Sequence, residues 1–369
     1  MASHDMRAAR LHKPGEAFTI DRIERPRRRE QDVLVEVKAC AIIPAMNAIV
    51  GGKGWFPLPP MPAVMGLDAA GIVLEAPDGL ADIAVGDRVY VDPFLSCGSC
   101  NECLEGNYLL CRNGALRGYF AFSPNGLKRL EEYPYGGLCE IITASPRNLV
   151  KLPPEVSFAQ GARFGYLGTS YAGLPKGGVG AGSSVAINGV TGTLGVGAVM
   201  LALAMGATRI LGFGRNRAIL DKLKALAPRR IDTLALGEGD AAAWLRAGTE
   251  GRGVDVVLDC SAGRGGPVAT AIAAMGGLKR GGIAINIGGL TEPLAIEPMR
   301  FMSQGLGYHG SNWFTVAEGR LMAEMARVGV LDLSVWTTRI YPLAGIGDAL
   351  ADMAQRPGGF VNVVVAPDQ

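Results

Sequence analysis

The segment from Ser184 to Met205 constrains the fold of this chain more than any other. An apolar run typical of a buried strand, Ser184 to Asn188, leads through a glycine-rich turn into the Ala-rich stretch Ala198 to Met205. Further apolar runs that read as buried parallel strands lie at residues 209–213, 254–259 and 283–287. Because amphipathic helical stretches separate these runs, the pattern predicts a doubly wound α/β domain.

The turn after the first strand is suited to binding a dinucleotide. A strand, a glycine turn and a helix in that order direct backbone N–H groups and the positive helix end towards a diphosphate. Glycine is required there because a Cβ atom would block the approach. A tightly packed strand-to-helix turn without a ligand is the alternative reading. The predicted cofactor contacts in this turn are Gly189, Gly192, Thr193, Leu194 and Gly195.

The residues after the second strand indicate which dinucleotide is bound. A site specific for NAD offers Asp or Glu to the ribose hydroxyls, whereas this chain offers Gly214, Arg215, Asn216 and Arg217. A guanidinium in place of the carboxylate favours a 2′-phosphate, to which Arg can form two hydrogen bonds. The sequence therefore predicts NADP(H), although both arginines could instead be solvated loop charges.

Four of the seven cysteines lie within fifteen residues, at Cys97, Cys100, Cys103 and Cys111. An odd number of cysteines and this clustering favour a metal site over a disulfide framework. Four thiolates can surround one zinc ion tetrahedrally and leave no open position, which is typical of a structural site. We expect one structural zinc per chain, the alternative being a set of unligated thiols.

The composition sets the class of protein. With 369 residues, of which 49% are hydrophobic and 19% charged, the chain can form two domains. A net charge of +2 and the lack of a basic cluster interleaved with aromatics argue against a nucleic-acid partner. No apolar run approaches the roughly 18 residues of a membrane span, and no signal-peptide pattern stands at the amino terminus. We expect a cytoplasmic protein.

Three stretches with different patterns of apolar and turn residues predict the domain organisation. Residues 1–164 carry short Val/Ile-rich runs between Gly/Pro turns, which predicts a β-barrel, with the cysteine lobe at about residues 95–115. Residues 165–312 form the α/β domain. Residues 313–369 return to mixed short elements, and we expect them to pack on the first domain.

Together, these features resemble the zinc-containing alcohol dehydrogenase branch of the medium-chain dehydrogenase/reductase superfamily. The resemblance covers nearly the whole chain and rests on the cysteine lobe and on residues 66–71, 86–89, 136–140, 253–260 and 359–365. It implies a GroES-like β-barrel catalytic domain beside a Rossmann domain, and a homodimer or homotetramer. It also implies that Thr169 contacts the nicotinamide, and Ile287 and Gly288 are expected at the cofactor too. The glycine loop itself is more similar to the quinone-reductase branch.

The chain departs from this family at the catalytic zinc. The three positions that hold zinc ligands in the family are Ile43, Leu67 and Gly165 here, and none can bind a metal. A shifted register with Cys40 as a displaced ligand is the alternative, but no His lies nearby. The proton-relay positions and the Asp behind the zinc are also replaced, by Ala45, Ala48 and Met46. We therefore expect an enzyme without catalytic zinc.

Hydride transfer without a metal requires a substrate that accepts electrons unaided. We expect NADP(H)-dependent reduction of an activated C=C or C=N bond in an enone, quinone or iminium ion. Asp68 is a candidate proton donor or a structural remnant. Ketone reduction with Tyr166 or Tyr171 as the acid is the alternative, and an inactive dinucleotide-binding protein is another. A small hydrophobic or aromatic substrate is expected beside Ile43, Ala48, Trp55, Leu67, Phe94 and Trp313.

Overall fold

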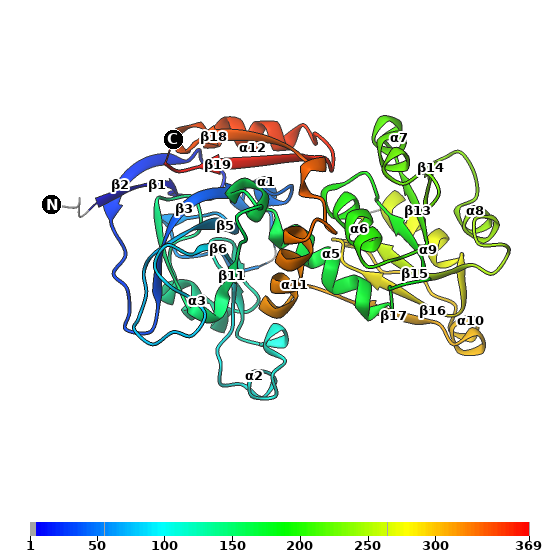
Figure 1. Cartoon of the computed structure of the whole chain (residues 1–369), viewed down its shortest axis with the longest axis horizontal. Coiled ribbons are helices and arrows are strands. Elements are labelled where there is room, and N and C mark those ends of the chain that lie inside the picture. Colours follow the sequence, from blue (N-terminus) through cyan, green and yellow to red (C-terminus); the bar gives the residue numbers. More distant parts are fainter. Residues whose placement is uncertain (1–4, 55, 264, 369) are drawn as a thin grey trace.

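The structure, a computed structural model, describes residues 5–54, 56–263 and 265–368. Trp55, which the sequence predicts in the substrate pocket, lies outside the described residues. The chain forms a β-rich part and an α/β part side by side, and the long helix α5 (Phe164–Lys176) lies between them (Figure 1).

The β-rich part is built on a seven-stranded sheet with the order β11-β6-β5-β3-β19-β18, in which β10 also pairs with β3. A three-stranded sheet, β2-β1-β4, and a small one, β7-β8-β9, complete it. Its strands are β1 (Asp5–Leu11), β2 (Thr19–Glu24), β3 (Val33–Ala41), β4 (Ala63–Val64), β5 (Asp68–Glu75), β6 (Arg88–Val91), β7 (Phe94–Leu95), β8 (Ala115–Leu116), β9 (Phe120–Ala121), β10 (Ile141–Ala144) and β11 (Leu149–Lys151). Its helices are α1 (Met46–Val50), α2 (Asn101–Leu104), α3 (Leu127–Glu132) and α4 (Phe158–Gly161).

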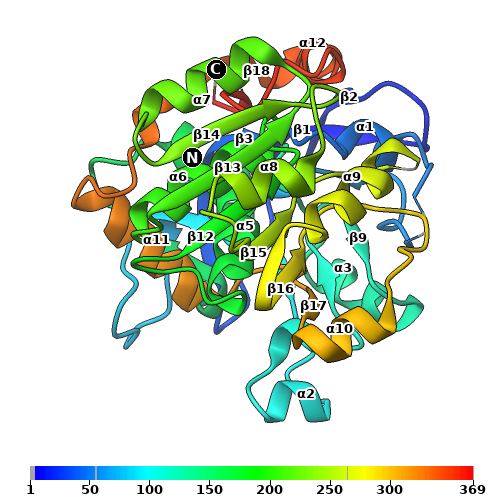
Figure 2. The same ribbon diagram turned by 90° about the vertical axis from the view of Figure 1, so that its right-hand side faces the viewer.

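The α/β part is a parallel six-stranded sheet with the order β14-β13-β12-β15-β16-β17, and helices cover it (Figure 2). This is the doubly wound arrangement that the sequence predicts. The strands are β12 (Ser184–Asn188), β13 (Arg209–Gly214), β14 (Ile231–Ala235), β15 (Val254–Asp259), β16 (Leu278–Asn286) and β17 (Gly307–Gly310). The helices are α6 (Thr193–Ala204), α7 (Arg217–Leu226), α8 (Ala241–Ala247), α9 (Gly266–Met275) and α10 (Pro298–Gln304).

The carboxyl-terminal segment lies against the β-rich part (Figure 1). It contains α11 (Val316–Arg327), β18 (Thr337–Pro342), α12 (Ile346–Ala354) and β19 (Val361–Ala366). The last strand pairs with β3, so that Val365 lies opposite Cys40. Residues from both ends of the chain thus share one sheet.

Two elements of the α/β part begin earlier than the sequence pattern suggests. Helix α6 starts at Thr193 and not at Ala198, because glycine at 195 lets the first turn lie against the preceding loop. A Cβ atom there would come 2.4 Å from the Gly189 carbonyl oxygen. Strand β16 starts at Leu278 and not at Ile283. Its first residues include the half-buried Lys279 and the exposed Arg280, so an apolar pattern does not reveal this part of the strand. Among the described residues, no helix is both long and apolar enough to cross a bilayer.

Candidate active site

The glycine loop between β12 and α6 is compact and leaves the start of the helix open. Gly189 has a φ of +75°, a conformation that side chains rarely adopt, and its N–H donates to the Phe213 carbonyl at 3.0 Å. Gly192 is exposed and precedes α6, and no side chain caps this helix end. Uncapped N–H groups at the positive end of a helix suit an anionic ligand. The arrangement therefore fits a dinucleotide diphosphate at Gly192, Thr193 and Leu194.

The other predicted cofactor contacts lie at the ends of neighbouring strands. Gly288 follows β16, and its N–H donates to the Asp259 carbonyl at 3.0 Å. Glycine is required at this position, since a Cβ atom would come 1.9 Å from the Ser261 carbonyl oxygen. Ile287 precedes it and is buried. Parallel strands present such ends at the edge where ligands of open α/β sheets bind.

The loop after β13 presents its side chains to solvent. Asn216 caps α7, where its side chain accepts a hydrogen bond from the Ile219 N–H at 3.2 Å. Arg217 forms an ion pair with Glu238. Arg215 is exposed, and Gly214 packs directly against the Thr191 side chain, which a Cβ would meet at 2.7 Å. Of the two arginines, Arg215 is therefore the one whose charge is available to a ligand.

A small cavity lies where the β-rich part, α5 and α6 meet. It has about 10 Å³, which is about enough to hold a single water molecule. Its lining includes Ile43, Asp68, Tyr166 and Thr193. The structure therefore brings together a position that holds a zinc ligand in the family, two candidate acids and the first residue of α6.

Asp68 is fully buried in this cavity wall. The Tyr90 hydroxyl donates to its Oδ1 at 2.7 Å, while Oδ2 has no hydrogen-bond partner among the described residues. Burial raises the pKa of Asp68 to about 7; the Tyr90 hydrogen bond opposes this rise and the nearby Asp92 adds to it. A carboxyl group in this environment stays partly protonated near pH 7, far above its ordinary range.

The Asp68 carboxyl group also occupies the space beside Gly165. A Cβ atom on Gly165 would come 2.0 Å from Oδ1 of Asp68, so a side chain cannot extend from this position unless Asp68 moves. Ile43 and Leu67, at the other two positions, are buried apolar side chains. These residues do not fit a catalytic zinc ion, since they offer no ligand set.

The remaining candidates on α5 differ in where their side chains lie. The Thr169 hydroxyl donates to the Gly165 carbonyl one turn earlier, at 2.8 Å. Tyr171 is buried but does not line the cavity, and burial together with the charge of Glu318 raises its pKa. Tyr166 does line the cavity, and burial raises its pKa as well. Of the two tyrosines, Tyr166 is therefore the one placed near Asp68.

The residues predicted beside the substrate lie in different surroundings. Ile43 lines the cavity, but Leu67, Phe94 and Trp313 are core side chains that do not, and Ala48 is exposed on α1. Two contacts explain this difference. The Trp313 indole donates to Asp92 at 2.8 Å, and Phe94 packs against Phe122 with ring centroids 5.7 Å apart.

The sequence alone does not predict the roles of three buried polar residues of this region. Tyr90 and Asp92 lie within and directly after the apolar run of β6, and Arg163 directly precedes α5. A polar residue inside an apolar run is a weak signal, because it does not identify its partner. Their roles depend on contacts with Asp68, Trp313 and the glycine loop, which come from distant parts of the chain.

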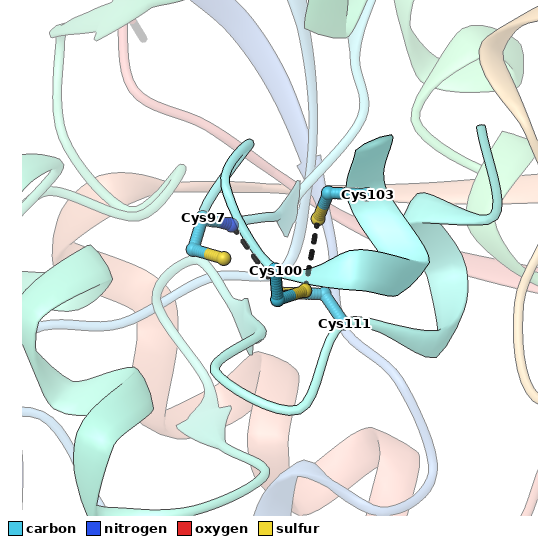
Figure 3. Close-up of side chains that lie close together, drawn as sticks. All are labelled: Cys97, Cys100, Cys103 and Cys111. Carbon is cyan, nitrogen blue, oxygen red and sulfur yellow. Dashed lines mark hydrogen bonds between the residues drawn. The ribbon is translucent and has the colours of Figure 1, made fainter. Parts of the chain in front are cut away.

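The four cysteines form a compact group in the lobe that contains α2 (Figure 3). All four sulfur atoms lie within 4.8 Å of one another, with Cys100 at 3.5 Å from Cys103 and 3.8 Å from Cys111. Sulfur atoms bound to one zinc at about 2.3 Å would lie about 3.8 Å apart, so the residues fit this ion. Among the described residues, this is the one group of three or more such ligands. The lobe projects from the β-rich part (Figure 1).

Comparisons with known proteins agree with this architecture. The model of the alcohol dehydrogenase GroES-like domain matches residues 29–154, and that of the zinc-binding dehydrogenase family matches residues 193–327. An alcohol dehydrogenase of Geobacillus stearothermophilus is 28% identical over 94% of this chain and 96% of its own. A 2-dehydro-3-deoxy-L-galactonate 5-dehydrogenase of Pseudoalteromonas atlantica is 27% identical over 82% of this chain and 83% of its own.

Solved structures show the same fold over the full length. The crystal structure of a zinc-binding dehydrogenase from Sinorhizobium meliloti 1021, bound to NADP, superposes with a TM-score of 0.83. It is 28% identical, and the match covers 99% of this chain and 100% of the other. The chain therefore belongs to the medium-chain dehydrogenase/reductase superfamily and is an oxidoreductase of the alcohol dehydrogenase-like type, with a GroES-like domain and a Rossmann domain.

Proposed function

We propose that this oxidoreductase uses NADP(H) and, without a catalytic zinc, transfers hydride to an activated C=C or C=N bond of a hydrophobic substrate. Enones, quinones and iminium ions are the substrate class. The observation that carries the proposal is the Asp68 carboxyl group, which fills the space beside Gly165 where a third zinc ligand would extend. Together with the apolar Ile43 and Leu67, it leaves no ligand set for a Lewis acid.

The residues around the cavity suit a metal-free reduction. NADPH supplies the hydride when bound. Hydride addition to an enone or quinone leaves negative charge on the remote oxygen, and a proton must then be delivered, whereas addition to an iminium ion gives the neutral amine directly. We assign this proton to Asp68, whose Oδ1 accepts from the Tyr90 hydroxyl and whose Oδ2 has no partner among the described residues. Tyr166, in the same cavity wall, is the acid that ketone reduction would require, but burial raises its pKa and so opposes the charged form.

A turnover assay tests this function. We expect NADPH oxidation with members of a panel of enones, quinones and imines, and slower oxidation with simple ketones. Preference for unactivated ketones would favour the alternative with Tyr166 as the acid. Tight NADPH binding without turnover of any compound would contradict the enzymatic role and favour a dinucleotide-binding protein.

The preference for NADP(H) is supported by Arg215. This side chain is exposed directly after β13, and the solved relative from Sinorhizobium meliloti is bound to NADP. Substituting Arg215→Ala should weaken NADPH binding by about 10- to 100-fold, because a charge-assisted contact to the 2′-phosphate is lost. NADH has no 2′-phosphate, so its binding should be nearly unchanged. Fluorescence titration of both cofactors measures this difference. Arg217→Ala is the matched variant, and equal losses for both cofactors in Arg215→Ala would contradict the assignment.

A homodimer through the α/β parts is also proposed. Strand β17 ends the six-stranded sheet, so its outer edge is available for pairing with a second copy. Large apolar side chains in β17 and in the segment that precedes it in the chain are exposed, namely Ile296, Met299, Met302 and Tyr308. A patch of this kind is typical of a protein interface. Light scattering at micromolar concentration tests the proposal, and a monomeric mass would contradict it.

A further inference from the structure

Arg163 is a buried cation without an acidic partner. It directly precedes α5, and only 5% of its surface is exposed. No Asp or Glu side chain among the described residues forms an ion pair with it, and its Nε has no hydrogen-bond partner there. Burying an unpaired charge is costly, so such groups commonly have a binding role.

The guanidinium group joins three segments of the chain by hydrogen bonds to carbonyl oxygens. It donates to Gly359 at 2.8 Å, to Val361 at 3.3 Å and to Thr193 at 3.4 Å. It also lies over the Trp336 ring, 4.8 Å from the centroid. Carbonyl dipoles offset part of the charge, but burial still lowers the pKa of Arg163 to about 9. Among the described residues, Asp68 is the one carboxyl group that lines the same cavity as Arg163, and burial raises its pKa as well.

These contacts place the cation beside the glycine loop. Thr193 is the first residue of α6, and Arg163 and Thr193 line the same cavity. Gly359 holds the carboxyl-terminal segment against the loop: its N–H donates to the Thr191 carbonyl at 3.0 Å. A Cβ on Gly359 would come 2.3 Å from the Gly192 carbonyl oxygen. The positive end of α6 and a guanidinium group without an acidic partner thus lie beside the same cavity.

We infer that Arg163 is a cofactor-binding residue, whose guanidinium supplies the positive charge for the diphosphate of the dinucleotide at the start of α6. This rests on the proposed function, because it assumes that a dinucleotide binds at the glycine loop. It assigns separate roles to two arginines. Arg163 acts on the diphosphate, which NADH and NADPH share, whereas Arg215 acts on the 2′-phosphate.

Three ligands separate these roles. In Arg163→Met, we expect NADPH and NADH to bind about tenfold or more weakly, by the same factor, because one charge-assisted contact is lost from both. Adenosine 2′-phosphate, which has no diphosphate, should keep its affinity in Arg163→Met and lose it in Arg215→Ala. Isothermal titration of the full-length protein measures all three affinities.

Arg117 provides a matched control. It is also a buried arginine, with 2% of its surface exposed; it donates to the Thr143 carbonyl and lies 4.7 Å from the Tyr133 ring centroid. Arg117 lies within the β-rich part and not beside the glycine loop. Arg117→Met should lower the melting temperature and leave all three affinities unchanged.

Three outcomes would overturn the inference: unchanged affinities in Arg163→Met, equal losses for all three ligands, or losses that Arg117→Met reproduces. If Arg163→Met does not fold, Arg163→Lys keeps the charge with fewer donors. It should then show a smaller loss, again shared by NADH and NADPH and absent for adenosine 2′-phosphate. A wild-type protein that binds neither dinucleotide would instead contradict the proposed function.

Discussion

Substituting Asp68→Asn should lower kcat/KM for an activated alkene by about 10²- to 10⁴-fold, the range for loss of a general acid. Asparagine has nearly the same volume, and its oxygen can still accept the Tyr90 hydroxyl, but it has no proton to donate. Because the pKa of Asp68 is raised to about 7, wild-type activity should be highest below this pH and decline above it. Steady-state kinetics from about pH 5 to 9, roughly two units on either side of the Asp68 pKa, should show this decline in the wild type and not in Asp68→Asn.

Asp92→Asn is the matched control for this prediction. Asp92 is equally buried, and its pKa is likewise raised to about 7, but it holds the Trp313 indole and does not line the cavity. Its charge contributes to the raised pKa of Asp68. Asp92→Asn should therefore keep a rate within a few-fold of wild type and move the decline to lower pH. A larger loss in Asp92→Asn than in Asp68→Asn would contradict the role of Asp68.

The same shift has a consequence for stability. A carboxyl group whose pKa is raised on folding stabilises the native state at low pH, and this contribution is lost as pH rises through the folded-state pKa. For Asp68 the window extends from the ordinary value of 3.8 to about 7. As pH rises through this window, the melting temperature of Asp68→Asn minus that of the wild type should therefore increase. A constant difference would show that Asp68 does not titrate there.

Substituting Cys103→Ser should release the metal from the lobe and lower the melting temperature by roughly 5 to 10 °C, which corresponds to a few kcal/mol in a chain of this size. The lobe contains only short elements, α2 and a turn of 3₁₀ helix at Tyr108–Leu110, so little apolar burial replaces the lost bonds. Elemental analysis and thermal unfolding of the purified variant measure the two effects.

Cys139→Ser separates metal loss from general core damage. Cys139 is buried outside the lobe, and its thiol donates to the carbonyls of Gly136 and Ile141 at 3.3 Å, which a hydroxyl can also do. This variant should keep its zinc. If Cys103→Ser retains metal and melts like the wild type, the lobe is not a structural zinc site.

Local sequence patterns predict much of this molecule. The strand, glycine loop and helix at Ser184–Ala204 and the cysteine lobe each depend on neighbouring residues, so the sequence shows them directly. The family resemblance then identifies Ile43, Leu67 and Gly165 as the altered positions. Spacing alone does not show that the Asp68 carboxyl occupies the space beside Gly165, because the two residues are far apart in the sequence and come together only in the folded chain.

The residues predicted at the substrate pocket are ones whose role the sequence alone does not decide. Phe94 and Trp313 are large and apolar, and such residues line pockets and fill cores alike. Their contacts with Phe122 and Asp92 decide between these roles, and both contacts join residues that are distant or separated by turns. Sequence patterns do not reveal Arg163 for the same reason: its acceptors lie far along the chain, at Thr193, Gly359 and Val361.

The absence of a catalytic zinc is tested most directly by the zinc content per chain, measured by elemental analysis of protein purified without added metal. The four lobe cysteines can hold one ion, whereas Ile43, Leu67 and Gly165 offer no ligand, so we expect about one zinc per chain. About two zinc ions per chain, with the second retained in Cys103→Ser, would contradict the metal-free site and place zinc-assisted alcohol and ketone chemistry first.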